Sequence, residues 1–186
     1  MPVRHPKFDF KVALNEKMIV LLNLAKPNIG DEAAAILGAL FTTTLRSALL
    51  ENPRPCTLIA DEFQTYGTSL FSGMLSEMRK FGLKMIVAHQ FISQIDEALR
   101  DAILGNTTQK IIFNVDHKDA EILAKAYNRL TQDFNPSAIT DLQAYQAFVN
   151  GHKVTLPPFT APHGTGKLSA VKAHTHRHFA RVAPSS

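Results

Sequence analysis

Cysteine is nearly absent from this chain of 186 residues, which has Cys56 as its one cysteine. No disulfide can therefore form within the chain, and a single cysteine fits a reducing compartment. No apolar run reaches the roughly 18 residues that span a bilayer, and residues 1–10 lack the apolar core of a secretory signal. We expect a cytoplasmic protein with no membrane span in this chain. Attachment to the cytoplasmic face of an inner membrane would depend on partners or on missing sequence.

Acidic residues are missing from residues 163–186, which carry Lys167, Lys172, Arg177 and Arg181. Without these four cations the basic and acidic residues of the chain balance, so its net charge of +4 originates in this segment. A basic, His-rich segment can contact nucleic acid through phosphate attraction. The same composition is typical of a solvated, disordered end. Both interpretations remain open, and both make this segment a tail separate from a compact domain over residues 1–162.

Short apolar runs alternate with helix-length segments along residues 17–159. Strands are expected over residues 17–25, 56–63, 83–90 and 109–115, with a short strand or hairpin within 144–159. Helices are expected over residues 31–52, 70–82, 93–104 and 116–130. Asp31 is the expected cap of the first of these helices, and Gly82 is the expected stop of the second. This alternation predicts an α/β fold with a mostly parallel sheet flanked by helices.

Polar residues follow the expected strands where ligands bind in parallel sheets, at the carboxyl ends. Asp61 and Glu62 end the apolar run "TLIADEF", and Gln90 ends the next expected strand. Residues 114–116 follow the strand after that. A strand ending in Asp-Glu matches the Walker B pattern, in which the first carboxylate holds Mg²⁺ through its water shell. The second carboxylate polarises an attacking water, and a nearby glutamine can orient it.

Each of these residues also has a plainer interpretation. Asp61 and Glu62 are consistent with the start of a polar loop, and Gln90 with a solvent-facing loop residue. Arg79 lies near the end of an expected helix, where a cation is favourable. The same arginine would suit an arginine finger that reaches a neighbouring subunit's phosphates. An unrelated α/β enzyme that uses Asp61 and Glu62 on a small molecule is a further alternative, and it requires a pocket complete within this chain.

Two motif-like segments of the tail fail a closer comparison. Residues 163–169, "HGTGKLS", lack the first glycine and the final Ser/Thr of a phosphate loop, and no strand precedes them. Residues 174–178, "HTHRH", contain possible metal ligands but have no supporting residues around them. Neither segment predicts a specific site.

Several blocks, in order, carry a resemblance to a known family. They are "MIVLLNLAKPNIGDEAAAILGALF", "TLIADEFQTYGT", "LSEMRKFGLKMIVAHQFISQID", "ILGNTTQKIIFNVDHKDAEILAK" and "ITDLQAYQAFVNGHKVTLPPFTAP". Together, over about residues 8–162, they resemble the carboxy-terminal half of the conjugative DNA-transfer ATPases. These include the TraG/TraD-like coupling proteins of type IV secretion, in the HerA–FtsK branch of RecA-like motors.

The resemblance implies a hexameric ring that hydrolyses ATP to move DNA, with relaxase or secretion-channel proteins as partners. Asp61 and Glu62 match the Walker B pair, with Asp61 as the metal ligand. Gln90 matches the glutamine that senses the γ-phosphate. Arg79 matches the arginine of the "RKFG" block, a candidate finger acting in trans.

One departure from the family limits these expectations. The family carries a phosphate loop (Walker A) well upstream of Walker B, and no Gly-Lys-Ser/Thr occurs before Asp61 in this chain. Backbone amides and the lysine of that loop hold the β- and γ-phosphates. We therefore expect part of a RecA-like P-loop fold, inactive alone, with ATP and Mg²⁺ bound only together with the missing half. The alternative is a non-catalytic module for DNA binding or ring assembly.

Overall fold

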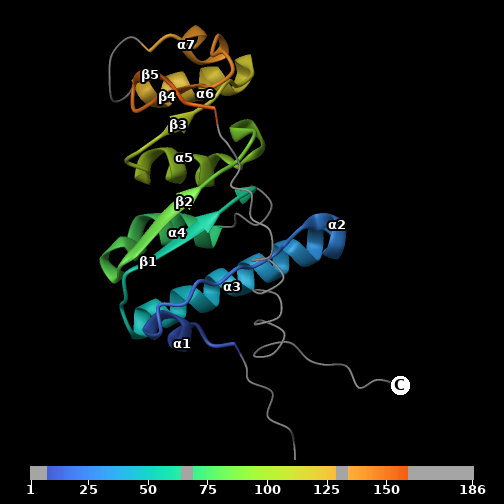
Figure 1. Cartoon of the computed structure of the whole chain (residues 1–186), viewed down its shortest axis with the longest axis vertical. Helices are drawn as coiled ribbons and strands as arrows, with labels where there is room; N and C mark the ends of the chain where they lie inside the picture. Colours follow the sequence, from blue (N-terminus) through green and yellow to red (C-terminus); the bar gives the residue numbers. More distant parts are fainter. Residues whose placement is uncertain (1–7, 64–68, 129–133, 159–186) are drawn as a thin grey trace, which may run out of the picture.

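The computed structural model describes residues 8–63, 69–128 and 134–158 (Figure 1). The cations Lys167, Lys172, Arg177 and Arg181 and both motif-like tail segments lie outside the described residues, as does the expected domain boundary at residue 162. Their sequence-based interpretations stay predictions.

The first described part is helical. Helix α1 (Phe10–Asn15) is capped by Asp9, whose carboxylate accepts a hydrogen bond from the Lys11 amide at 2.8 Å. The short helix α2 (Lys26–Ile29) leads into the long helix α3 (Asp31–Glu51), which confirms the expected helix there. Gly30 occupies the cap position of α3, so Asp31 is its first residue rather than its cap. A carboxylate in the first turn still favours the helix through its dipole.

The strand expected over residues 17–25 is wrong. This segment is extended but pairs with no strand among the described residues, and it runs beside α3. Its apolar side chains are largely exposed; Ile19 is 89% exposed and Leu21 is 74% exposed. An apolar run becomes a strand only where a neighbouring strand accepts its backbone hydrogen bonds, and composition alone does not supply that partner.

Strands β1 (Cys56–Ala60) and β2 (Leu83–Val87) form a parallel pair with Ile59 opposite Ile86. They confirm two of the expected strands and the parallel arrangement. The connection between them contains α4 (Ser69–Glu77) and the 3₁₀ helix η2 (Met78–Phe81), so the single expected helix is split in two. Gly82 ends η2 with a left-handed φ of 94°, as its position in the sequence predicts.

The second sheet is antiparallel, with the order β3 (Ile111–Ile112), β4 (Gln146–Val149) and β5 (His152–Thr155). The strand expected over residues 109–115 is therefore shorter than predicted and joins β4 rather than the parallel pair. The β4–β5 hairpin confirms the expected one. Its turn residues Asn150 and Gly151 both have positive φ, the conformation that Asn-Gly adopts most readily in two-residue hairpin turns.

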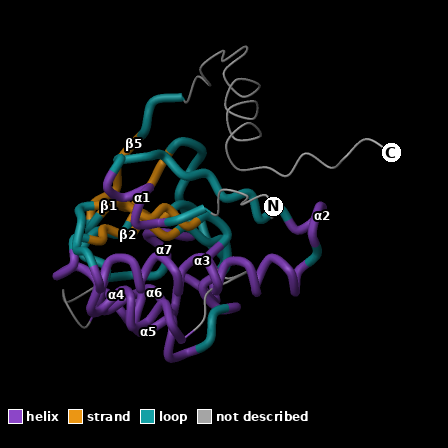
Figure 2. Tube along the Cα trace, turned by 90° about the horizontal axis from the view of Figure 1, so that it is seen from below, coloured by secondary structure: helices purple, strands orange, loops and turns teal. Residues whose placement is uncertain are grey.

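Helices connect and cover these sheets. The 3₁₀ turn η3 (Ile92–Gln94) leads from β2 to α5 (Glu97–Asn106), and α6 (His117–Asn128) and α7 (Ser137–Thr140) flank the antiparallel sheet. Figure 2 shows α4, α5 and α6 gathered on one side of the strands. Along the long axis in Figure 1, α3 lies beside β1, and α5 lies between β2 and β3.

Two apolar clusters hold the elements together. The larger joins β1, α4, η3, α5, β3, α6, α7 and β4 through side chains such as Phe63, Leu99 and Phe148. The smaller joins α3, α4, η2 and β2 through Leu49, Met74 and Met78. Because α4 contributes to both, it links the N-terminal helices to the rest of the described chain.

One helix in the described part of the chain, α3, has the length and apolar composition of a membrane-spanning helix. Its residues Ala34, Gly38 and Leu49 are buried, and the helix packs against α1, α4 and η2. Buried helices of folded domains meet the same criterion of length and composition, so this finding alone does not indicate a membrane span.

Candidate functional site

The carboxyl ends of β1 and β2 bring three predicted site residues together. Asp61 and Glu62 form the turn that follows β1, and Gln90 follows β2. The Gln90 side-chain amide donates a hydrogen bond to the Glu62 carboxylate with an Nε2–Oε1 distance of 2.7 Å. The structure thus places in direct contact two side chains that are 28 positions apart in the sequence.

Backbone hydrogen bonds extend the parallel pairing into this turn. The Ala88 amide donates to the Ala60 carbonyl at 2.9 Å, and the Phe63 amide donates to the Ala88 carbonyl at 3.0 Å. Phe63 is fully buried and anchors the turn in the larger apolar cluster. These bonds hold the two strand ends side by side, which allows Glu62 to reach Gln90.

The turn itself is unusual at Glu62, which has a φ of 51°. A side chain other than glycine rarely adopts this left-handed conformation, and such residues are concentrated at functional sites. The Glu62 amide donates to the Asp61 carboxylate at 3.0 Å, which supports the turn locally. The conformation directs successive carboxylates out of an otherwise apolar strand.

The donor set at this edge fits a magnesium ion that is shared with phosphate. Mg²⁺ in nucleotide sites is held by one or two carboxylates, with water and phosphate oxygens completing its octahedral shell. Asp61 and Glu62, both exposed, are carboxylates of the kind that such a site uses. Among the described residues, no group of three or more His, Cys, Asp and Glu side chains could hold a metal alone. This edge of the sheet therefore suits a metal that arrives with a ligand.

Arg79 lies elsewhere. It belongs to η2, which precedes β2, and therefore sits at the amino-terminal end of the parallel pair, opposite Glu62 and Gln90. The five residues of β2 separate the two ends, a span of about 16 Å at roughly 3.3 Å per residue. Within this chain Arg79 is not part of the Glu62–Gln90 site. A role for it in trans stays a prediction.

Sequence reasoning missed a buried carboxylate behind Gln90. Asp119, in the first turn of α6, is 1% exposed. It accepts hydrogen bonds from the amides of Ile92 at 2.9 Å and Ser93 at 3.0 Å. Asp119 thereby fixes the loop that follows Gln90. The sequence signal was present in part, because Asp116 and Asp119 are spaced as in a capping box, and Asp116 does accept from the Asp119 amide at 2.8 Å.

Residues 114–116 have structural roles. The Asn114 side-chain amide donates to the carbonyl groups of Thr140 and Leu142 at 2.7 and 3.0 Å, which ties β3 to α7. Asp116 caps α6 as described above. The polar residues after the fourth expected strand therefore stabilise the fold rather than join the Glu62–Gln90 site.

His89 lies half-buried between the end of β2 and Gln90. Burial lowers its pKa from the ordinary value of 6.5, and the nearby Asp119 carboxylate opposes that shift. Its Nδ1 atom is buried and has no hydrogen-bond partner within the described part of the chain. The neutral imidazole is therefore the favoured form in the folded state.

We expect the stability of the protein to fall as the pH drops below about 6.5 because of His89. His89 binds a proton more readily in the unfolded protein than in the folded protein. Its contribution to the free energy of unfolding is therefore complete above pH 6.5 and is lost as the pH falls toward the lower pKa of the folded state. Urea unfolding at pH 7.5, 6.5 and 5.5 measures this slope. His89→Gln should flatten this slope; a slope unchanged from that of the native protein would contradict the assignment.

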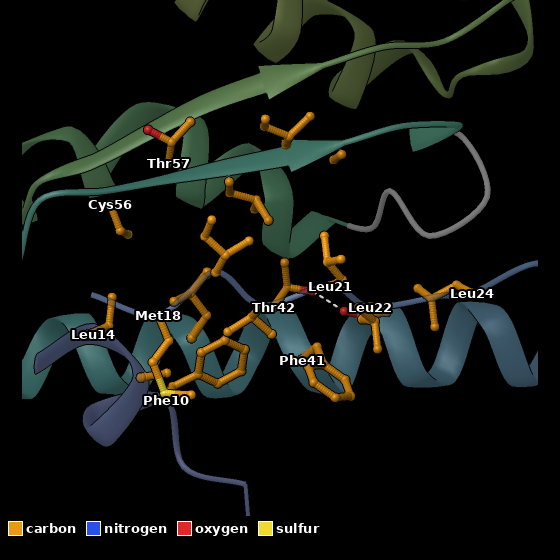
Figure 3. A pocket seen from close by; sticks show the side chains of 18 of the residues that line it. Phe10, Leu14, Met18, Leu21, Leu22, Leu24, Phe41, Thr42, Cys56 and Thr57 are labelled. Atoms are coloured by element: carbon orange, nitrogen blue, oxygen red, sulfur yellow. Dashed lines mark hydrogen bonds between the residues drawn. The ribbon is translucent and has the colours of Figure 1, made fainter. Parts of the chain in front are cut away.

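An apolar groove lies next to β1. It has a volume of about 770 Å³ and is bordered by α1, α3, β1 and residues 18–24. Figure 3 shows Met18, Leu21 and Leu22 along one wall, with Phe41 and Thr42 of α3 beside them. Its lining carries few polar side chains, so the groove suits an apolar surface better than a nucleotide.

Part of the chain matches a known protein family. Residues 55–130 match a family model described as the TraM recognition site of TraD and TraG. This part of the chain is TraG/TraD-like. The match includes β1, β2 and the four residues to which the sequence resemblance assigns roles, Asp61, Glu62, Gln90 and Arg79. No curated protein sequence matches the chain at a significant level.

Solved structures of a bacterial conjugative coupling protein, TrwB, share the fold of this TraG/TraD-like chain. The unbound monoclinic form of TrwBdeltaN70 gives a TM-score of 0.63 at 16% identity, covering 84% of this chain and 45% of that one. The complex of TrwB with the GTP analogue GDPNP gives 0.57 at 18% identity, covering 76% and 44%. The complex with ADP and Mg²⁺ gives 0.55 at 18% identity, covering 76% and 43%.

These similarities confirm the predicted fold class, an α/β RecA-like P-loop NTPase fold present in part. The chain spans less than half the length of the TrwB chains that it matches. The described residues therefore form a domain that is like a conjugative coupling protein, with its Asp-Glu turn at the carboxyl edge of the parallel strands.

Proposed function

We propose that this chain is the Walker B half of an ATP-driven, DNA-translocating motor of conjugation or type IV secretion. The observation that carries the proposal is the contact between Glu62 and Gln90 at the carboxyl ends of β1 and β2. Asp61 lies in the same turn, and the fold is that of coupling proteins for which nucleotide complexes are known. The chain has no phosphate loop, so it requires one from another polypeptide segment.

Each residue has a distinct chemical role in this proposal. Asp61 would hold Mg²⁺ through the water shell of the ion, and the ion would neutralise phosphate charge during hydrolysis. Glu62 accepts a proton from the attacking water. The hydrogen bond from Gln90 fixes the orientation of the Glu62 carboxylate, and the second N–H of the same amide would donate to a water or phosphate oxygen. Arg79, at the opposite end of the strands, would act on the nucleotide of a neighbouring subunit in a ring.

The partners follow from the same proposal. The description of the matching family names TraM recognition by TraD and TraG, and we extend that to residues 55–130 of this chain. The Walker B half would function in a hexameric ring around DNA. Relaxase or secretion-channel proteins would be its further partners. Lys167, Lys172, Arg177 and Arg181 are the tail cations expected to contact that DNA.

The test is ATP turnover in the presence of Mg²⁺ and DNA. The chain alone should show none, and addition of a segment with the phosphate loop of a TraG/TraD-like protein should produce turnover. Glu62→Gln should then lower the rate by about 10²-fold or more, since a positioned general base contributes that much. Glu121→Gln, at an exposed position on α6, is the matched control and should leave the rate unchanged.

Two results would count against the proposal in different ways. Robust turnover by the chain alone, abolished by Glu62→Gln, would show that the chain is catalytically complete. Turnover in the mixture that is indifferent to Glu62→Gln would remove the Walker B assignment itself.

A second candidate function is a non-catalytic module that joins a ring of longer subunits. The apolar groove beside β1 favours it, because exposed apolar side chains such as Ile19 and Leu21 line the groove, and apolar grooves of this kind suit protein contacts. The mixing experiment separates the two candidates. Stable co-purification with a TraG/TraD-like subunit, without turnover, would support the module.

A further inference from the structure

The outer face of α3 carries a stripe of side chains that no described element covers. Exposed residues recur there at intervals of four and three positions, which sets five side chains in line: Ile36, Leu40, Thr43, Ser47 and Leu50. Ile36 is 67% exposed, Leu40 is 57% exposed and Leu50 is 40% exposed. At 1.5 Å per residue this outer stripe of α3 is about 21 Å long.

The outer stripe is separate from the apolar groove beside β1. At 100° per residue, the α3 residues that border that groove lie on the opposite side of the helix; they are Gly38, Phe41, Thr42 and Leu45. Between Glu32 and Glu51 the sequence of α3 has one charged residue, Arg46. Its guanidinium lies 3.9 Å from the Glu77 carboxylate of α4, to one side of the stripe. An exposed helix face without charge over this length is typical of a protein contact.

The spacing of the stripe suits a second helix, and its order of side chains suits a second copy of α3. Alternating intervals of four and three positions form the seam of paired helices. The Thr43 hydroxyl donates to the Ala39 carbonyl at 2.7 Å, so its donor is satisfied within the helix. In an antiparallel pair with its two-fold axis between Thr43 and Ser47, these two small residues face each other across the axis. Leu40 of each copy then faces Leu50 of the other, so the stripe is complementary to itself.

Charges at the two ends of α3 favour the antiparallel orientation. Glu32, in the first turn, and Arg54, just beyond the last turn, form no ion pair within the described part of the chain, whereas the carboxylates of Asp31 and Glu51 are paired with lysines. Antiparallel pairing brings Arg54 of each copy toward Glu32 of the other, and it opposes the two helix dipoles. A parallel pair would place Glu32 beside Glu32.

We propose that the outer stripe of α3 binds the same stripe of a second copy of this chain, with the two helices antiparallel. One pair of helices buries less surface than a standard interface of about 1,600 Å², so the dimer is weak and reversible. A contact about a two-fold axis joins two copies and then is closed, whereas a ring is built from head-to-tail contacts. The inference therefore does not rest on the proposed function, and it uses none of the residues assigned to the nucleotide.

Sedimentation equilibrium of the full chain, at about 5 to about 300 µM, measures the pairing. Monomers should convert to dimers as the concentration rises. Leu40→Lys should raise the dissociation constant at least about tenfold, because it places an unpaired charge in the contact. Leu40 is exposed in the single chain, so this variant should keep the native circular dichroism spectrum. Leu21→Lys is the matched control; it removes a leucine that is 74% exposed beside the other groove, and it should leave the dissociation constant unchanged.

Charge reversal tests the orientation of the two helices. Glu32→Arg and Arg54→Glu should each weaken the dimer about two- to fivefold, the range of exposed ion pairs. The double variant should restore the native dissociation constant, because each new arginine again meets a carboxylate of the other copy. A double variant as weak as the single ones would overturn the antiparallel arrangement.

Disulfide formation maps the contact in a Cys56→Ser background. A mixture of the Thr43→Cys and Ser47→Cys chains should cross-link on oxidation, since a disulfide needs Cα atoms within about 7 Å. Ile36→Cys should not, because its two copies would lie about 27 Å apart along the antiparallel pair.

Three results would overturn the proposal. One is a monomer at every concentration. Another is an association that Leu21→Lys abolishes and Leu40→Lys leaves intact, which would place the contact at the groove beside β1. The third is a monomer that binds phosphatidylcholine vesicles and loses this binding in Leu40→Lys, which would assign the outer stripe to a lipid surface.

Discussion

Gly82→Ala is expected to lower the free energy of unfolding by at least about 3 kcal/mol. A Cβ atom at this position would lie 2.7 Å from the carbonyl oxygen of Arg54 and 2.8 Å from its carbonyl carbon. Both are backbone atoms just before β1, and the Gly82 carbonyl accepts a hydrogen bond from the Cys56 amide at 3.1 Å. The clash cannot be relieved without moving β1 or β2, and the φ of 94° adds strain for any L side chain.

Urea unfolding followed by circular dichroism measures this effect. Gly73→Ala is the matched control, because a Cβ at Gly73 in α4 would meet nothing within 4 Å. Alanine there should raise stability by about 0.5–1 kcal/mol, the usual gain over glycine inside a helix. If the two variants unfold at the same urea concentration, the close approach of Gly82 to Arg54 is not the constraint described here.

Asp119→Ala is expected to cost about 3 kcal/mol of stability and to loosen the loop after Gln90. The substitution leaves the buried amide of Ile92 and the part-buried amide of Ser93 without their acceptor. Hydrogen exchange at these two amides should therefore accelerate more than exchange elsewhere in the molecule. Gln90, two residues from Ile92, would lose part of the support that places it against Glu62.

Asp119→Asn should fall between the native protein and Asp119→Ala. Its amide keeps one oxygen acceptor but turns an NH₂ group toward the second backbone amide. Glu121→Ala removes an exposed carboxylate on the same helix and its exposed contact with His117, and it should change stability by less than about 0.5 kcal/mol. Unchanged exchange at Ile92 and Ser93 in Asp119→Ala would mean that Asp119 does not hold this loop.

The elements that the sequence predicts well are those with their own local signals. Helix α3 has a long apolar stripe bounded by Gly30 and by the prolines after it. Strands β1 and β2 are apolar runs between clear breakers, and Gly82 marks the stop before β2. Local propensity and tertiary packing agree at these positions, which is why sequence patterns suffice there.

Elements that need a distant partner were harder to predict. Residues 17–25 have the composition of a buried strand but pair with no strand of the described chain, and Ile111–Ile112 pair with β4 in an antiparallel sheet. Composition indicates which residues favour a strand, but it does not indicate with which neighbouring strand they pair. The same limit applies to Asp119, whose helix position is visible in the sequence but whose two acceptor contacts depend on how α6 packs on η3.

The turn at Asp61 and Glu62 could be predicted from the sequence only in part. Sequence pattern placed Asp61, Glu62 and Gln90 at neighbouring strand ends, and the structure places Glu62 and Gln90 in contact. Nothing in the sequence indicates the left-handed φ of Glu62 or the backbone bond from Phe63 to Ala88 that makes the contact possible. Arg79 is close to β2 in the sequence, but it lies at the end of that strand opposite to Glu62 and Gln90.

The short sheets have a practical consequence for handling the protein. Strand β1 pairs with β2 on one side and, in the described residues, with nothing on the other, where the apolar segment 18–24 lies exposed. An unpaired edge beside exposed apolar side chains is a template for intermolecular strand pairing. Purified alone at high concentration, the chain is therefore prone to aggregate through this edge. Replacing Ile19 or Leu21 with lysine or glutamate should reduce this aggregation.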